Sequence, residues 1–182
     1  CDYWLVRYNE TGDTIWTRSF GSDSLEIPKR LVQNADGSYL LLGSVKEENS
    51  DNLFFVKADS QGNELWRKSF KSDINYFGED VVSLEEEGFI LVGAKSTEQE
   101  NKKLWMTKLD AKGEMVWEKT FGEEFTGCCK SIKKLPTGGF AITGEISTPG
   151  QKESDIWGAR TDENGELVWE SQISTPGLKA WP

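Results

Sequence analysis

The segment KLWMTKLDAKGEMVWEKTFG, residues 103–122, decides the fold of this chain. Two stretches that contain β-branched and aromatic residues flank a turn running from Asp110 to Gly113. The aspartate side chain can accept hydrogen bonds from the backbone amides that follow it, and the glycine supplies the positive φ that closes a tight hairpin. Side chains alternate between two faces along the stretch from Trp105 to Leu109. The segment therefore predicts a β-hairpin.

This hairpin pattern recurs four times along the 182 residues, with a period of roughly 50 residues. Each copy has a tryptophan that follows a glycine by four residues. The tryptophans are Trp16, Trp66, Trp117 and Trp169, and the glycines are Gly12, Gly62, Gly113 and Gly165. A second cluster has the same period and places a glycine four residues after an aromatic residue, at Tyr39, Phe89 and Phe140. This cluster predicts a second hairpin in the repeat.

Two hairpins in each repeat make four strands, which is the signature of a β-propeller blade. The sequence thus predicts an all-β fold in one domain, 1–182. Its parts are a half-blade at 2–21, full blades at about 25–70, 78–121 and 127–173, and a tail at 174–182. Stacked blades bury their faces through aromatic residues that recur once per repeat. We therefore interpret the four tryptophans as packing residues between blades, with a ligand box as the alternative.

About three and a half blades leave the predicted ring incomplete, because a closed propeller has at least about four blades. The half-blade is expected to lack its inner strands, and the last blade is expected to lack a neighbour. Open sheet edges and bare faces promote association. We expect the chain to belong to a larger ring or to pair with another chain, and a twisted open array is the third arrangement.

The composition excludes several classes of function. The chain has 31 acidic and 21 basic residues and a net charge of −10, which argues against a nucleic-acid or anionic-membrane surface. It contains no histidine, so this chain alone cannot form a Ser-His-Asp, Cys-His or histidine–zinc site. The acidic run from Glu85 to Glu87 is interpreted as a solvated turn. We predict no metal site and no bound cofactor.

The three cysteines suggest different roles. Cys1 is the lipidation candidate, because a mature bacterial lipoprotein begins with cysteine; the alternative is that the sequence was cut there. Cys128 and Cys129 are interpreted as small residues on a strand. The alternatives are a strained vicinal disulfide and a redox pair whose thiolate is stabilised by neighbouring lysines.

The repeat resembles those of a family of β-propeller proteins that are common among secreted and surface proteins of Bacteroidota. The resemblance rests on DYWLVRYNETGDTIWTRSFG (2–21) with NADGSYLLLG (34–43), and on KLWMTKLDAKGEMVWEKTFG (103–122) with PTGGFAITG (136–144). It implies a propeller fold and a location in the cell envelope, on the outer-membrane surface or outside the cell. It implies little about activity, because one fold hosts many functions. The hairpin element is also distantly similar to the repeat of quinone-dependent dehydrogenase propellers.

The candidate binding residues lie between the predicted blades. Loops on a rigid scaffold usually carry function, and the segments that join one blade to the next differ most between repeats. They hold aromatic residues outside the repeat pattern, namely Tyr76, Phe77 and Phe125. We predict these three as binding residues; the alternative is that they cover strand ends or plug the ring mouth.

Together these observations predict a non-enzymatic binding or scaffold module of the bacterial cell envelope. The expected partner is another protein chain, further propeller blades or a glycan, and the membrane is contacted only through a lipid on Cys1. The alternative is a fragment of a propeller enzyme that acts on glycans or uses a quinone. An enzyme is expected to show clustered carboxylates or a metal at one rim, whereas a scaffold is expected to show a large apolar contact at the open blade ends.

Overall fold

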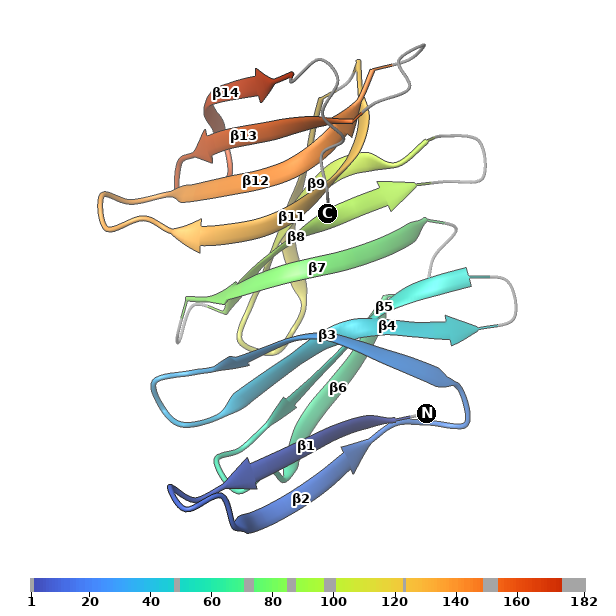
Figure 1. Cartoon of the computed structure of the whole chain (residues 1–182), viewed down its shortest axis with the longest axis vertical. Coiled ribbons are helices and arrows are strands. Elements are labelled where there is room, and N and C mark those ends of the chain that lie inside the picture. Colours follow the sequence, from blue (N-terminus) through green and yellow to red (C-terminus); the bar gives the residue numbers. More distant parts are fainter. Residues whose placement is uncertain are drawn as a thin grey trace. The chain divides into compact units, whose positions relative to one another are not determined.

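The computed structural model describes residues 2–47, 50–70, 74–84, 88–96, 101–122, 124–148 and 154–174, and the regular elements in these ranges are β-strands (Figure 1). The strands are β1 (Tyr3–Tyr8), β2 (Thr14–Phe20), β3 (Leu25–Gln33), β4 (Tyr39–Glu47), β5 (Ser50–Ala58), β6 (Glu64–Phe70), β7 (Asn75–Ser83), β8 (Phe89–Ser96), β9 (Lys103–Leu109), β10 (Met115–Phe121), β11 (Thr126–Lys134), β12 (Phe140–Ser147), β13 (Asp155–Thr161) and β14 (Leu167–Ile173). Within the described ranges, no helix has the length and apolar character needed to cross a membrane.

The strands form four sheets in chain order. A two-stranded sheet, β1-β2, is followed by three four-stranded sheets, β3-β4-β5-β6, β7-β8-β9-β10 and β11-β12-β13-β14. Each sheet is an antiparallel meander in which neighbours along the chain are neighbours in the sheet. This arrangement confirms the predicted all-β fold, with half a blade followed by three four-stranded blades.

The turns between the last two strands of each sheet follow the predicted chemistry. In the turn before β10, the backbone N–H groups of Lys112 and Glu114 donate to Asp110 Oδ1 at 2.8 and 2.9 Å. Gly113 closes this turn with a φ of 79°, a conformation that glycine adopts at no steric cost. Asp59 and Asp162 make the same pair of bonds in their own turns.

The chain divides into two compact units, one up to Gly78 and one from Glu79 onward. In the first unit, the β1–β2 hairpin packs on one face of the β3–β6 sheet. Its core consists of Tyr3, Leu5, Phe20, Tyr39, Leu41, Val45, Phe54, Val56 and Ala58, with Trp16 packed against them. The Tyr3 ring meets the Phe54 ring edge to face, with centroids 5.2 Å apart, and the Tyr3 hydroxyl donates to the Phe54 carbonyl at 3.1 Å.

The second unit packs β8, β9 and β10 against the β11–β14 sheet. Its core includes Ile90, Val92, Leu104, Met106, Phe121, Ile132, Ile142 and Trp157. The buried carboxylate of Asp80 on β7 links this strand to β11, because its Oδ2 accepts from Ser131 Oγ and from the Ile132 N–H, each at 3.0 Å. These two bonds to one carboxylate link the third sheet to the fourth.

The structure corrects the prediction that Tyr76 and Phe77 lie in a loop. The first strand of the third sheet begins at Asn75 instead of residue 78. Burial alternates along this strand at Tyr76, Gly78 and Asp80, which is the period expected of a half-covered β-strand. The Tyr76 ring also packs edge to face on Phe70, with centroids 6.0 Å apart.

Candidate interaction faces

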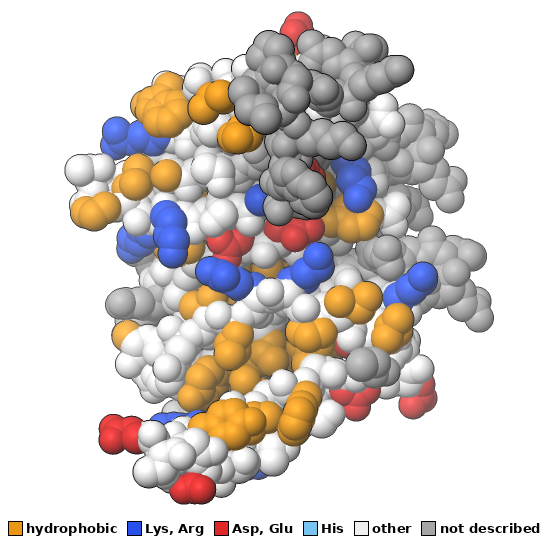
Figure 2. Space-filling model, viewed as in Figure 1, with side chains coloured by type: hydrophobic (Ala, Val, Ile, Leu, Met, Phe, Trp, Pro, Cys, Tyr) orange, Lys and Arg blue, Asp and Glu red, His pale blue; other side chains and the backbone are white. Residues whose placement is uncertain are grey.

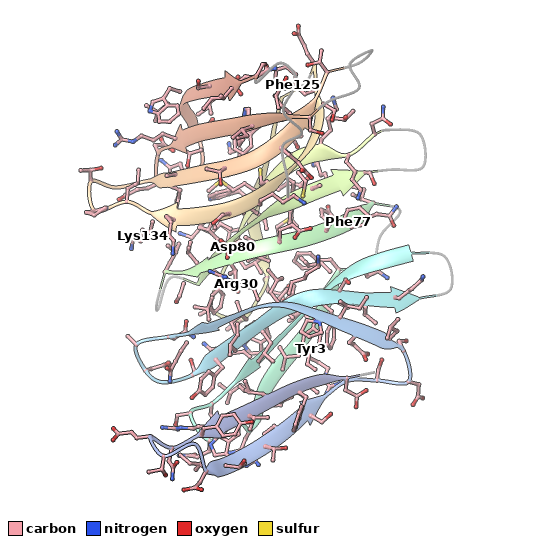
Figure 3. All side chains as sticks on the ribbon, in the orientation of Figure 1. Tyr3, Arg30, Phe77, Asp80, Phe125 and Lys134 are labelled. Carbon is pink, nitrogen blue, oxygen red and sulfur yellow. The ribbon has the colours of Figure 1, made fainter. Side chains whose placement is uncertain are left out.

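The structure does not place the three predicted binding residues on one exposed patch. Tyr76 is buried, and Phe77 and Phe125 are each half-buried. Figure 3 labels Phe77 on β7 and Phe125 just before β11. Phe125 precedes β11, where its ring packs on the core of the second unit. Its backbone carbonyl accepts from Lys103 Nζ at 3.0 Å, and its N–H donates to the Gly122 carbonyl. These contacts favour the interpretation that Phe125 covers a strand end, whereas Tyr76 and Phe77 lie within β7 itself.

The described residues contain no cluster of three or more Cys, Asp or Glu side chains suited to hold a metal. The vicinal cysteines lie on β11 as separate buried thiols. Burial raises the pKa of the Cys128 thiol to about 11 and raises the pKa of Cys129 as well, the opposite of what a reactive thiolate needs. The structure therefore favours strand positions over a disulfide or a redox pair. Cys1 and the run from Glu85 to Glu87 lie outside the described residues.

Each unit contains one sheet-on-sheet interface, and the two interfaces use the same repeat positions. We call the face of a sheet that packs on the next sheet along the chain its trailing face, and the opposite face its leading face. In each interface, the trailing face of the earlier sheet covers the leading face of the later sheet. In the first unit, Tyr3 and Phe20 belong to a trailing face, and Phe54 to the leading face that they cover. In the second unit, Leu104 and Phe121 belong to a trailing face, and Trp157 to the leading face that they cover. The Phe121 and Trp157 ring centroids are 5.8 Å apart.

The leading face of the β1–β2 hairpin is exposed, although its repeat equivalents are buried. Trp4 is 70% exposed, whereas Phe54, Trp105 and Trp157 at the same repeat position are 6%, 0% and 1% exposed. Tyr8 lies further along β1 on the same face as Trp4 and is also exposed. We call Trp4, Val6 and Tyr8 the leading end face.

The trailing face of the β11–β14 sheet is exposed in the same way. Ile156 and Ile173 pair across β13 and β14 and are 46% and 59% exposed, whereas their equivalents Tyr3 and Phe20 are 0% and 3% exposed. On the same face, four residues further along β13, Arg160 pairs with Trp169, which is also exposed. We call Ile156, Arg160, Trp169 and Ile173 the trailing end face. Figure 2 shows apolar side chains at the surface over the hairpin and over β13 and β14.

The recurring tryptophan and the recurring glycine form a contact between sheets. A Cβ added to Gly62 in the β5–β6 turn meets Trp16 Cζ3 at 2.9 Å, and one added to Gly165 in the β13–β14 turn meets Trp117 Cη2 at 2.6 Å. Each tryptophan ring therefore packs against the glycine turn of the next sheet, and the glycine position has no space for a side chain. A Cβ added to Gly12 meets nothing within 4 Å.

A basic side chain reinforces the same contact. In the first unit, Arg7 Nη1 on β1 donates to the backbone carbonyl of Ser60 in the β5–β6 turn, at 3.0 Å. Arg160 occupies the Arg7 position in the last sheet. Its Nη2 donates to Thr137 Oγ1 at 3.4 Å, and its buried Nε has no hydrogen-bond partner among the described residues.

Sequence reasoning predicted association through bare blade faces but did not select these residues. The period aligns Trp4 and Ile156 with their equivalents in the other repeats, but only the structure shows that those equivalents are buried. A scan against models of known protein families found no match, and a search of curated proteins found no relative.

Proposed function

We propose that the chain is a non-enzymatic binding or scaffold module that joins other protein through its leading and trailing end faces. The observation that carries this proposal is the contrast in burial at equivalent positions, from 1% at Trp157 to 70% at Trp4. Apolar faces of this kind, bordered by polar residues, mark protein interaction sites. The partner is a protein, because the exposed residues are those that pack sheet on sheet within each unit.

The cell envelope or surface is the proposed location of this module. The repeat resembles those of secreted and surface propeller proteins, and the net charge of −10 suits a module that binds protein and not nucleic acid. Catalysis receives no comparable support, since the described carboxylates form no cluster suited to a metal and the buried thiols of Cys128 and Cys129 have raised pKa values.

The test is the size of the native complex in gently solubilised envelope fractions from the producing bacterium. The wild-type protein is expected in a particle larger than its own polypeptide. Trp4→Glu and Ile173→Glu each place a charge on one end face and are expected to reduce the size of the particle. Leu65→Glu is the matched control, because Leu65 is exposed to a similar degree but lies on neither end face. A wild-type chain that fractionates alone, or end-face variants that leave the particle unchanged, contradicts the proposal.

A further inference from the structure

We infer that the β1–β2 hairpin of a second copy of this chain packs on the trailing end face, so that copies associate head to tail. This inference rests on the proposed function, which assigns the end faces to protein binding, and it names the partner. The chain carries both halves of an interface that each of its units already contains once.

The first pair of complementary features is Trp169 and Gly12. Within each unit, the recurring tryptophan of one sheet seats under the glycine turn of the next sheet, as Trp16 does under Gly62. Trp169 is 51% exposed, and Gly12 has open space where its equivalents meet an indole ring. Both turns have the same backbone, because Gly12 and Gly62 have φ values of 88° and 78°. Trp169 can therefore pack against the Gly12 turn of a second copy in the way that Trp16 packs against Gly62.

The second pair is Arg160 and the backbone carbonyl of Glu10. Arg7 donates to the carbonyl of Ser60, the residue that follows Asp59 in its turn. Glu10 is the equivalent of Ser60, because it follows Asn9 in a turn held by the same hydrogen bonds. Arg160 stands at the position of Arg7, whose Nη1 is the donor in the first unit. Its Nη2 donates to Thr137 Oγ1 at 3.4 Å, so Nη1 is the group that we assign to the Glu10 carbonyl of a second copy.

The apolar remainder of the two end faces matches in the same register. Ile156 and Ile173 stand at the positions of Tyr3 and Phe20, which cover the leading face of β3–β6. Trp4 and Val6 stand at the positions of Phe54 and Val56 on the face that is covered. Head-to-tail association thus repeats a contact of known geometry. Because the two faces differ, the interface is heterologous, and it generates either a closed ring or an open array.

The experiment measures sedimentation velocity of the purified chain over a range of concentrations. The wild-type chain is expected to associate as its concentration rises. Trp4→Glu and Trp169→Glu are each expected to sediment as single chains, with a Kd weakened roughly 30-fold or more, the size of a hot-spot loss. Circular dichroism checks that each variant is folded. Ile173→Glu and Gly12→Ala give a second variant for each face, and Leu65→Glu is expected to associate like the wild type.

Mixing the variants distinguishes head-to-tail association from contacts between identical faces. A Trp4→Glu chain keeps its trailing end face and a Trp169→Glu chain keeps its leading end face, so an equimolar mixture is expected to form a one-to-one complex. Contacts between identical faces predict no new species on mixing. A wild-type chain that stays single at all concentrations, or a mixture that stays dissociated, overturns the inference. If the envelope complex persists in that case, the partner is a different protein and the proposed function stands.

Discussion

The contact between the recurring tryptophan and the recurring glycine can be tested in the first unit, where Trp16 packs against Gly62. Gly62→Ala places a Cβ 2.9 Å from Trp16 Cζ3 and 2.8 Å from Arg18 Cγ. Gly12→Ala is the matched control within the same unit, because Gly12 has the same positive φ and open space around it. The two variants therefore share the backbone cost and differ only in the steric overlap.

The expected magnitudes follow from these two contributions. An alanine in the left-handed region costs about 1–2 kcal/mol, which is the whole expected loss for Gly12→Ala. Gly62→Ala adds an overpacking cost of about 1–3 kcal/mol, because the indole ring cannot bend away. We therefore expect the free energy of unfolding to fall by roughly 2–5 kcal/mol in Gly62→Ala.

The assay is urea unfolding followed by circular dichroism, at concentrations low enough that the chain does not associate. Trp16→Phe removes the ring atoms that the new Cβ meets, so the double variant with Gly62→Ala is expected to lose less than the sum of the two single variants. Equal losses for Gly12→Ala and Gly62→Ala, or strict additivity in the cycle, would refute the claim that the tryptophan and the glycine form one contact.

Three further predictions concern single groups. Peptide mapping after treatment with iodoacetamide at pH 8 is expected to find Cys128 and Cys129 unmodified unless denaturant is added, because burial raises both thiol pKa values; rapid labelling of the folded chain would contradict their burial. Asp80→Ala is expected to destabilise the second unit by about 2–4 kcal/mol, since the half-buried Ser131 hydroxyl and the buried Ile132 N–H lose their acceptor. Chemical denaturation measures this loss, and a neutral effect would count against the link. The pKa of Asp59 lies below the ordinary 3.8 because the Asn63 side chain donates a hydrogen bond to the carboxylate. The carboxylate therefore stabilises the fold at pH values above 3.8, and this stabilisation is lost as the pH falls through the pKa of the folded state. NMR titration is expected to show a higher Asp59 pKa in Asn63→Ala.

The fold was predictable because each repeat carries two independent signals for its strands. One is the alternation of side chains between the two faces, and the other is the set of turn residues that join the strands. Gly113 with Asp110 fixes a hairpin locally, and the period multiplies that signal through the chain. The start of β7 was not predictable in the same way. Tyr76 and Phe77 match no recurring position, so composition placed them in a loop, whereas packing of Tyr76 on Phe70 extends the strand through them.

The sequence predicted that bare blade faces would bind a partner, but it did not predict which residues form those faces. Periodicity identifies Trp4 and Trp157 as equivalents, but the same letter pattern describes a buried and an exposed tryptophan. Burial depends on whether a neighbouring sheet is present, which is a property of the assembled chain and not of a local segment. Trp169 was for this reason predicted only as a packing residue, whereas it is exposed.

Exposure alone does not identify an interface, and the repeat supplies the reference that does. Ile15, Leu65, Val116 and Val168 occupy one repeat position and are 54%, 56%, 56% and 56% exposed. Their exposure belongs to the blade itself, because it does not depend on which sheets are adjacent. Trp4 is exposed whereas its equivalents are buried, so its exposure marks a face that no sheet of the described residues covers.

The exposed areas of Trp4 and Trp169 limit the strength of the association between copies. A tryptophan buries about 150–250 Å², so Trp4 and Trp169, exposed by 70% and 51%, retain on the order of 100 Å² each to bury. At about 25 cal/mol per Å² this yields about 5 kcal/mol for the pair, which is close to the lower estimate of about 4 kcal/mol for the entropy lost on association. The isoleucines and the Arg160 donor must therefore contribute to any measurable affinity. The balance between these contributions is narrow, so the association is expected to be weak, and a single charge on either face is expected to separate the copies.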